Sequence, residues 1–147
     1  MSNVKQYRDR DLSTHVIHNQ LQDVRNMLEY YKRRGKLDKI NQLLRHEEEQ
    51  YTALVWAITQ HHHDMVKLLL SYGAAIKQPN DESNWNALHY AVAWDNTDII
   101  RTLFQHVHAL EHRIQLLEQQ DKHTGETPRD MLDIQPRKYT YQKTLLF

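Results

Sequence analysis

The sequence has no cysteine, and only three glycines and three prolines occur among its 147 residues. Without cysteine there can be no disulfide framework, thiol nucleophile or zinc ribbon, so we expect a protein of a reducing compartment. Three glycines are too few for the loops that cradle phosphates, and the chain carries no nucleotide-binding or serine-hydrolase motif. The scarcity of residues that break helices favours a helical fold.

Long apolar runs and a net charge are also missing. No run approaches the roughly 18 residues needed to cross a bilayer, so we expect no membrane span. The first nine residues lack the apolar core of a secretory signal, which favours a cytoplasmic location. The 19 basic residues balance 19 acidic ones, and this neutrality argues against a general nucleic-acid binder. The length predicts one structural domain.

A repeat with an offset of 34 residues organises the middle of the chain. It superposes residues 52–57 on 86–91 and residues 64–70 on 98–104. Each unit reads as a short apolar helix, a tight turn and a second, amphipathic helix. Asp64 and Asp98 are predicted to cap the second helices.

These residues resemble the ankyrin repeat. The match rests on Thr52-Ala53-Leu54 with Ala57, on the apolar helix 65–70 and its Gly73-Ala74 turn, and in the next unit on residues 87–91 and 99–104. A third start appears at Gly125-Glu126-Thr127-Pro128. The resemblance implies an all-α solenoid of helix-turn-helix units with N-terminal capping helices.

The domain limits follow from this resemblance. Residues 1–46 are predicted to form an N-terminal helical cap or degenerate first repeat. Residues 47–133 hold the repeats, at about 47–80, 81–120 and a partial unit at 121–133. Residues 134–147 form a basic and aromatic C-terminal tail.

Several positions depart from the family pattern. Gln50 and Asn84 replace the glycine of the hairpin, and His61 and Asp95 replace the glycine after the first helix. One apolar stripe covers residues 16–28. We expect residues 37–44 to form the back helix of a degenerate unit, and residues 106–120 to extend the second helix of the second unit.

The resemblance also implies a function, because ankyrin stacks usually bind another protein on the concave surface formed by hairpin tips and front helices. The family's contact positions can be transferred to this chain one by one. An exposed row of Tyr51, Trp85 and Trp94 would anchor the partner. The alternative is that Trp85 or Trp94 packs over its neighbour, while Trp56 and Tyr90 are expected in the core. The candidate partner-binding residues are Tyr51, Trp85, Trp94, Glu49, Gln60, Glu82 and His123.

Two other classes of function remain as alternatives. Basic residues at 32–39, with Arg137, Lys138 and Lys143, could contact nucleic acid or a membrane surface. His61, His62 and His63 could serve a metal-dependent enzyme, but three consecutive histidines diverge between two helices. The favoured reading is a non-catalytic module with no cofactor, no metal and no small-molecule substrate, as a monomer or weak homodimer.

The cellular setting is predicted from composition. Degenerate repeats rich in Gln and His resemble ankyrin proteins of intracellular bacteria or viruses, which implies an effector that acts in the host cytosol. The final Leu145-Leu146-Phe147 is compatible with a C-terminal secretion signal, or with a tail that docks on the last repeat.

Overall fold

The computed structural model describes residues 9–77 and 83–134, and these form short helices and one small β hairpin. The elements are α1 (Asp9–Ile17), α2 (Leu21–Arg33), the 3-10 helix η1 (Leu37–Asn41), β1 (Leu44–His46), β2 (Glu49–Tyr51), α3 (Ala53–Thr59), α4 (His63–Ser71), α5 (Ala87–Ala93), α6 (Thr97–His106), α7 (Leu110–Glu118) and α8 (Pro128–Ile134). The all-α class is confirmed.

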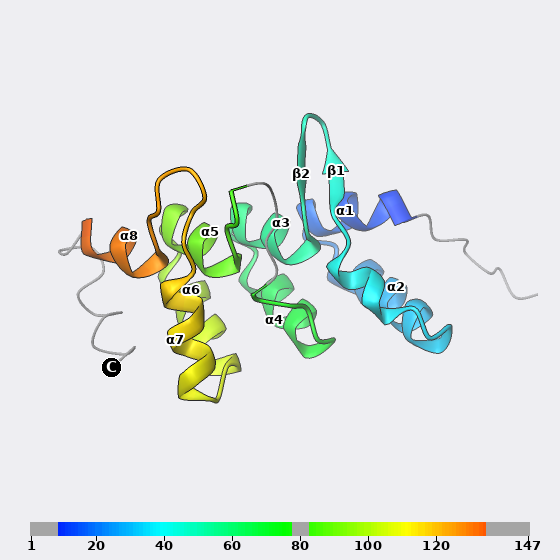
Figure 1. Ribbon diagram of the computed structural model, residues 1–147. Helices are drawn as coiled ribbons and strands as arrows, with labels where there is room; N and C mark the ends of the chain where they lie inside the picture. The colour runs from blue at the N-terminus through cyan, green and yellow to red at the C-terminus, as the bar shows by residue number, and fades with distance from the viewer. Residues whose placement is uncertain (1–8, 78–82, 135–147) are drawn as a thin grey trace, which may run out of the picture.

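The helices stack in two rows. Helices α1, α3, α5 and α8 follow one another in the front row, and α2, α4 and α6 form the back row (Figure 1). Helices α1, α3 and α5 each pack on the back helix that follows in the chain, as α3 does on α4. Neighbouring pairs then pack side by side, which is the quasi-linear arrangement of a repeat solenoid.

Front helices α3 and α5 lie at the centre of the core. Residues Ala53 to Ile58 are all buried, as are Ala87 to Val92, because each helix is packed between two neighbours. The two helices begin 34 residues apart, at Ala53 and Ala87, as the repeat offset requires. The Thr52 hydroxyl accepts a hydrogen bond from the Val55 amide at 3.3 Å, and Asn86 forms a capping box with His89.

A left-handed residue follows three of the front helices. The φ angles of Asn19, His61 and Asp95 are 54°, 57° and 57°. His61 and Asp95 therefore adopt the left-handed conformation of the glycine that they replace in the family pattern. The equivalent turn at Asn19 shows that α1 and α2 form a unit like the two that follow, so the apolar stripe over 16–28 belongs to two helices and not one.

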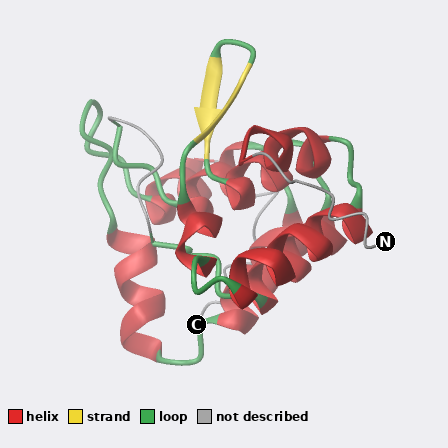
Figure 2. Ribbon diagram, turned by 90° about the vertical axis from the view of Figure 1, so that its right-hand side faces the viewer, coloured by secondary structure: helices red, strands yellow, loops and turns green. Residues whose placement is uncertain are grey.

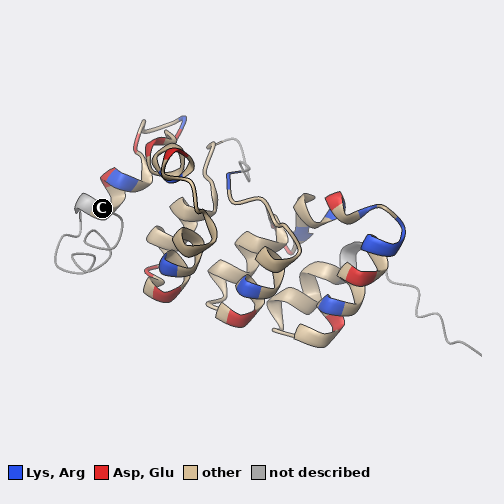
Figure 3. Ribbon diagram, turned by 90° about the horizontal axis from the view of Figure 1, so that it is seen from below, with Lys and Arg blue, Asp and Glu red and all other residues tan. Residues whose placement is uncertain are grey.

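The caps of the back helices differ from the prediction. Helix α6 begins two residues earlier than a cap at Asp98 would place it, and the Asn96 side chain accepts a hydrogen bond from the Ile99 amide at 3.0 Å. Asp64 and Asp98 instead lie in the first turns of α4 and α6. There a carboxylate favours the helix through the macrodipole and not as a cap. Figure 3 shows the resulting pattern, in which an acidic and a basic residue recur on each back helix.

Two predicted helices are wrong. Residues 37–44 form the 3-10 helix η1 and lead into β1, because α2 already supplies the back helix of the first unit. The stretch 106–120 is not one long helix either. Helix α6 ends at His106, the chain is extended at Val107 with a ψ of 101°, and α7 starts separately at Leu110 and packs against α8.

The β hairpin stands out from the helices (Figure 2). Strands β1 and β2 are antiparallel, with His46 opposite Glu49, so Glu47 and Glu48 form a two-residue turn. Glu47 has a φ of 56°, whereas Gln50, which replaces the hairpin glycine of the family pattern, lies within β2. At the next hairpin Asn84 does adopt the predicted conformation, with a φ of 68°.

Candidate protein-binding surface

Three of the predicted binding residues converge on one buried ring. The ring centroids of Tyr51, Trp85 and Trp94 lie 5.3, 5.1 and 5.8 Å from that of Tyr90. Tyr51 leads into α3, whereas Trp85 and Trp94 flank α5, so the cluster joins two neighbouring repeats. Edge-to-face and tilted contacts of this kind stabilise aromatic clusters beyond the burial of their area.

The three rings differ in exposure. Trp94 has 38% of its surface exposed, and Tyr51 and Trp85 are half-buried. The Trp85 indole stacks on His89 at 5.5 Å, and its Nε1 donates a hydrogen bond to Asp121 Oδ2 at 2.5 Å. Of the three residues predicted to form an exposed row, only Trp94 is exposed, and Trp85 packs over its neighbours.

The predicted core position of Trp56 is confirmed. Only 4% of Trp56 and 3% of Tyr90 are exposed. The Trp56 Nε1 donates to the Leu44 carbonyl at 2.8 Å, which ties α3 to β1. The rings of Tyr51 and His46 contact Trp56 edge-on at 4.9 and 5.8 Å, so its orientation is held from several sides.

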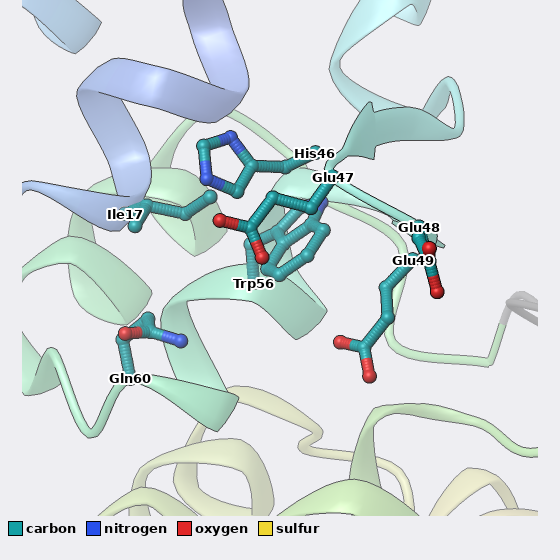
Figure 4. A pocket seen from close by; sticks show the side chains of 7 residues that line it. All are labelled: Ile17, His46, Glu47, Glu48, Glu49, Trp56 and Gln60. Atoms are coloured by element: carbon teal, nitrogen blue, oxygen red, sulfur yellow. The ribbon is translucent and has the colours of Figure 1, made fainter.

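A hollow of about 710 Å³ lies between the β hairpin and the ends of α1 and α3 (Figure 4). We call it the hairpin hollow. It is lined by Ile17, His46, Glu47, Glu48, Glu49, Trp56 and Gln60. In Figure 4 the Glu47 carboxylate lies in front of the Trp56 ring, and the Gln60 amide faces it from below. Of the predicted site residues, Glu49 and Gln60 meet here.

The remaining predicted residues lie elsewhere. His123 is exposed in the loop between α7 and α8, which projects on the same side as the β hairpin (Figure 1). Glu82 lies outside the described residues. The structure therefore does not bring His123 together with Glu49 or Gln60, and the predicted residues form more than one group.

Asp121 organises the loop of His123, and sequence reasoning did not find it. Its carboxylate accepts hydrogen bonds from the backbone amides of Thr124 at 3.0 Å and His123 at 2.5 Å, as well as from the Trp85 indole. These donors favour the charged form and hold the pKa of Asp121 below its usual value. The available signal was the Asp-x-x-Thr spacing before a glycine turn, which is typical of an aspartate that accepts from its own loop.

Residues 83–86, just before α5, are also joined to the α7–α8 segment. The Lys122 amide donates to the Ser83 carbonyl, and the Gln119 side chain donates to the Asn84 carbonyl, at 2.8 and 2.7 Å. Asn86 adds a bond from Nδ2 to the Leu116 carbonyl at 3.2 Å. The resemblance assigns bonding between repeats to His89, but His89 accepts from the Asn86 amide of its own repeat, and Asn86 reaches the next segment.

The three consecutive histidines have different partners. His61 contacts Asn96, His62 contacts the Ile17 carbonyl and His63 contacts the Thr102 hydroxyl, at 2.9, 2.8 and 2.6 Å. They diverge as the sequence predicts, and His62 bonds to the neighbouring unit. Within residues 9–77 and 83–134 no group of three His, Asp or Glu side chains is arranged to hold a metal ion.

The basic residues after α2 partly cover aromatic rings. The Arg34 guanidinium lies 4.7 Å from the centre of the Tyr30 ring, and Lys39 Nζ lies 5.6 Å from that of Tyr31. Figure 3 shows this basic turn at the end of the stack that holds α2. Cation–π contacts give these two charges a structural use.

Comparison with known families agrees with this architecture. The family described as ankyrin repeats (3 copies) matches residues 18–128, about three quarters of the chain. The protein therefore belongs to the ankyrin-repeat family, whose members are generally modules for protein–protein interaction. No curated protein matches the chain. None of the helices in the described part of the chain is long and apolar enough to cross a membrane.

Proposed function

We propose that this protein is a non-catalytic module that holds a partner protein on its concave face, the surface formed by the hairpins and the front helices. The observation that carries the proposal is the convergence of Tyr51, Trp85 and Trp94 on Tyr90. A cluster built from two repeats forms one continuous aromatic patch. Large aromatic residues supply contact area at low cost in side-chain entropy, which is why they dominate the binding energy of many interfaces.

The three rings have different roles in this proposal. Trp94 supplies the exposed contact area. Tyr51 and Trp85 are half-buried and form a fixed platform, because contacts with Tyr90, Trp56 and Asp121 restrain them before any partner arrives. Restraint of this kind reduces the entropy that is lost on binding.

The groups with shifted pKa values support a non-catalytic role. The Tyr72 hydroxyl donates to Glu29 at 2.6 Å, which lowers the pKa of Glu29, raises that of Tyr72 and joins α4 to α2. Hydrogen bonds from the amide and hydroxyl of Thr127 lower the pKa of Asp130 at the start of α8. Asp121 orders a loop. Each of these shifts has a local structural cause, so none of them requires a catalytic site.

The test compares two exposed apolar side chains by affinity capture and mass spectrometry. Trp94→Ala removes the proposed anchor, and Leu110→Ala, on α7, is the matched control, with 66% of Leu110 exposed. We expect a protein that binds the wild type and Leu110→Ala but is lost from Trp94→Ala, with all three chains folded by circular dichroism. Capture that survives Trp94→Ala and is lost with Leu110→Ala would place the binding surface on α7 instead.

The cellular setting is part of the proposal. Degenerate repeats rich in Gln and His support an effector-type protein that works in a host cytosol. We further propose that the protein is a monomer or weak homodimer. A reporter fused to the last twelve residues tests the first statement by its transfer into host cells. Analytical ultracentrifugation tests the second, and a stable dimer at micromolar concentration would contradict it.

A further inference from the structure

The hairpin hollow concentrates negative charge in a protein whose formal net charge is zero. Glu47, Glu48 and Glu49 line it, and no Lys or Arg does. Within residues 9–77 and 83–134, none of these three carboxylates forms an ion pair. Because the chain has 19 basic and 19 acidic residues, this local excess comes from placement and not from composition. The charge is left available to a ligand.

The floor of the hollow is apolar, aromatic and rigid. The Trp56 indole is held by its hydrogen bond to Leu44 and by the edges of the Tyr51 and His46 rings. Ile17 at the end of α1 adds an aliphatic wall (Figure 4). A volume of about 710 Å³ lies within the range of small-molecule sites, so it admits a long side chain together with part of its backbone.

We propose that the hairpin hollow binds an arginine side chain of the partner protein. A guanidinium is planar, weakly hydrated and donates in a fork that matches a carboxylate. It can therefore bind a Glu47 or Glu49 carboxylate while its apolar stem lies against Ile17 and the small exposed part of Trp56, which is 4% of that residue. A lysine ammonium is a strongly hydrated point charge and would use the carboxylates alone. This inference deepens the proposed function and rests on it.

The hollow also contains a side-chain amide that can bond to a ligand. Gln60 also lines the hollow, below Glu47 in Figure 4, and rotation of its side-chain amide would present an oxygen that accepts from a guanidinium N–H. Because these contacts come from α1, the hairpin and α3, the hollow exists only while the first two units are packed together. Binding therefore requires the folded stack.

The experiment measures binding of fluorescein-labelled hexa-arginine and hexalysine to the full chain by fluorescence anisotropy. We expect hexa-arginine to bind more tightly. The variant Glu47→Gln/Glu48→Gln/Glu49→Gln should weaken its binding by at least about tenfold, since it removes charge-assisted hydrogen bonds. The matched variant Asp38→Asn/Asp98→Asn/Glu111→Gln makes the same change in net charge on other surfaces and should change binding by less than about twofold.

Nuclear magnetic resonance locates the site on the wild-type chain, independently of any variant. The three tryptophans give three indole N–H signals, and we expect hexa-arginine to shift the Trp56 signal in a saturable way. Equal weakening by both triple variants, equal binding of the two peptides, or an unmoved Trp56 signal would each overturn the proposal.

The two proposals can fail separately. Shifts at Trp85 and Trp94 without one at Trp56 would reject the hairpin hollow and leave the aromatic cluster as the binding surface. Loss of the Trp94→Ala effect in affinity capture, with hexa-arginine still bound beside Trp56, would reject the aromatic anchor and retain the hollow.

Discussion

At the scale of single residues, Glu47 adopts a strained backbone conformation that glycine would adopt without strain. Its φ of 56° lies in the left-handed region, where a side chain is strained and glycine is not. We expect Glu47→Gly to raise the free energy of unfolding by about 0.5–1 kcal/mol, measured by urea denaturation. In Glu48→Gly, at the other turn position, no such relief is available, and stability should fall. Equal effects of the two changes would contradict this account.

Asp121 gives the protein a sensitivity to acid. Its pKa is lowered in the folded state, chiefly by the backbone amides of Thr124 and His123 and also by the Trp85 indole. A lowered pKa stabilises the fold at pH values above the ordinary range of an aspartate, and this stabilisation is lost as the pH falls through that range and below it. We expect Asp121→Asn to lower the melting temperature at pH 7 and to reduce the further loss toward pH 3. If the melting temperatures of the wild type and the variant fall in parallel as the pH is lowered, Asp121 contributes nothing to the sensitivity to acid.

At the scale of elements, α7 is a helix inserted before the last unit, and its beginning is exposed whereas its end is buried. Leu117 is 2% exposed, whereas Ile114, one turn earlier, is 45% exposed. We expect Leu117→Ala to cost about 2–4 kcal/mol of stability because it opens a cavity. Ile114→Ala should stay within about 0.5 kcal/mol. Chemical denaturation compares the two variants, and similar losses would mean that the beginning of α7 is covered as well as its end.

The whole molecule is a linear stack, so the position of a unit should govern its protection. Helix α5 packs on α3, α6 and α8, whereas α1 has a neighbouring front helix only at α3. In repeat proteins each unit is stabilised by itself and by its neighbours. Hydrogen exchange followed by mass spectrometry should therefore show the slowest exchange in α3 and α5 and faster exchange in α1 and α8. Uniform exchange across all four would indicate a single cooperative unit.

Local signals were sufficient for much of the architecture. The 34-residue offset, the caps at Thr52 and Asn86, and the burial of Trp56 and Tyr90 all follow from patterns a few residues long, because helical periodicity and capping act over one or two turns. The same reasoning misplaced helix ends. Residues 106–120 keep a helical pattern throughout, and nothing local shows that the chain turns at Val107.

The amino-acid sequence by itself determined the family, the repeat units and the types of residue on the proposed binding surface. The tertiary structure alone decided which of them meet. Tyr51 and Trp94 share one ring because two repeats pack in register, and Ile17 faces Glu47 because α1 lies beside α3 and the hairpin. These contacts join segments about 30 or more residues apart, and they depend on how whole helices pack, which no short pattern encodes.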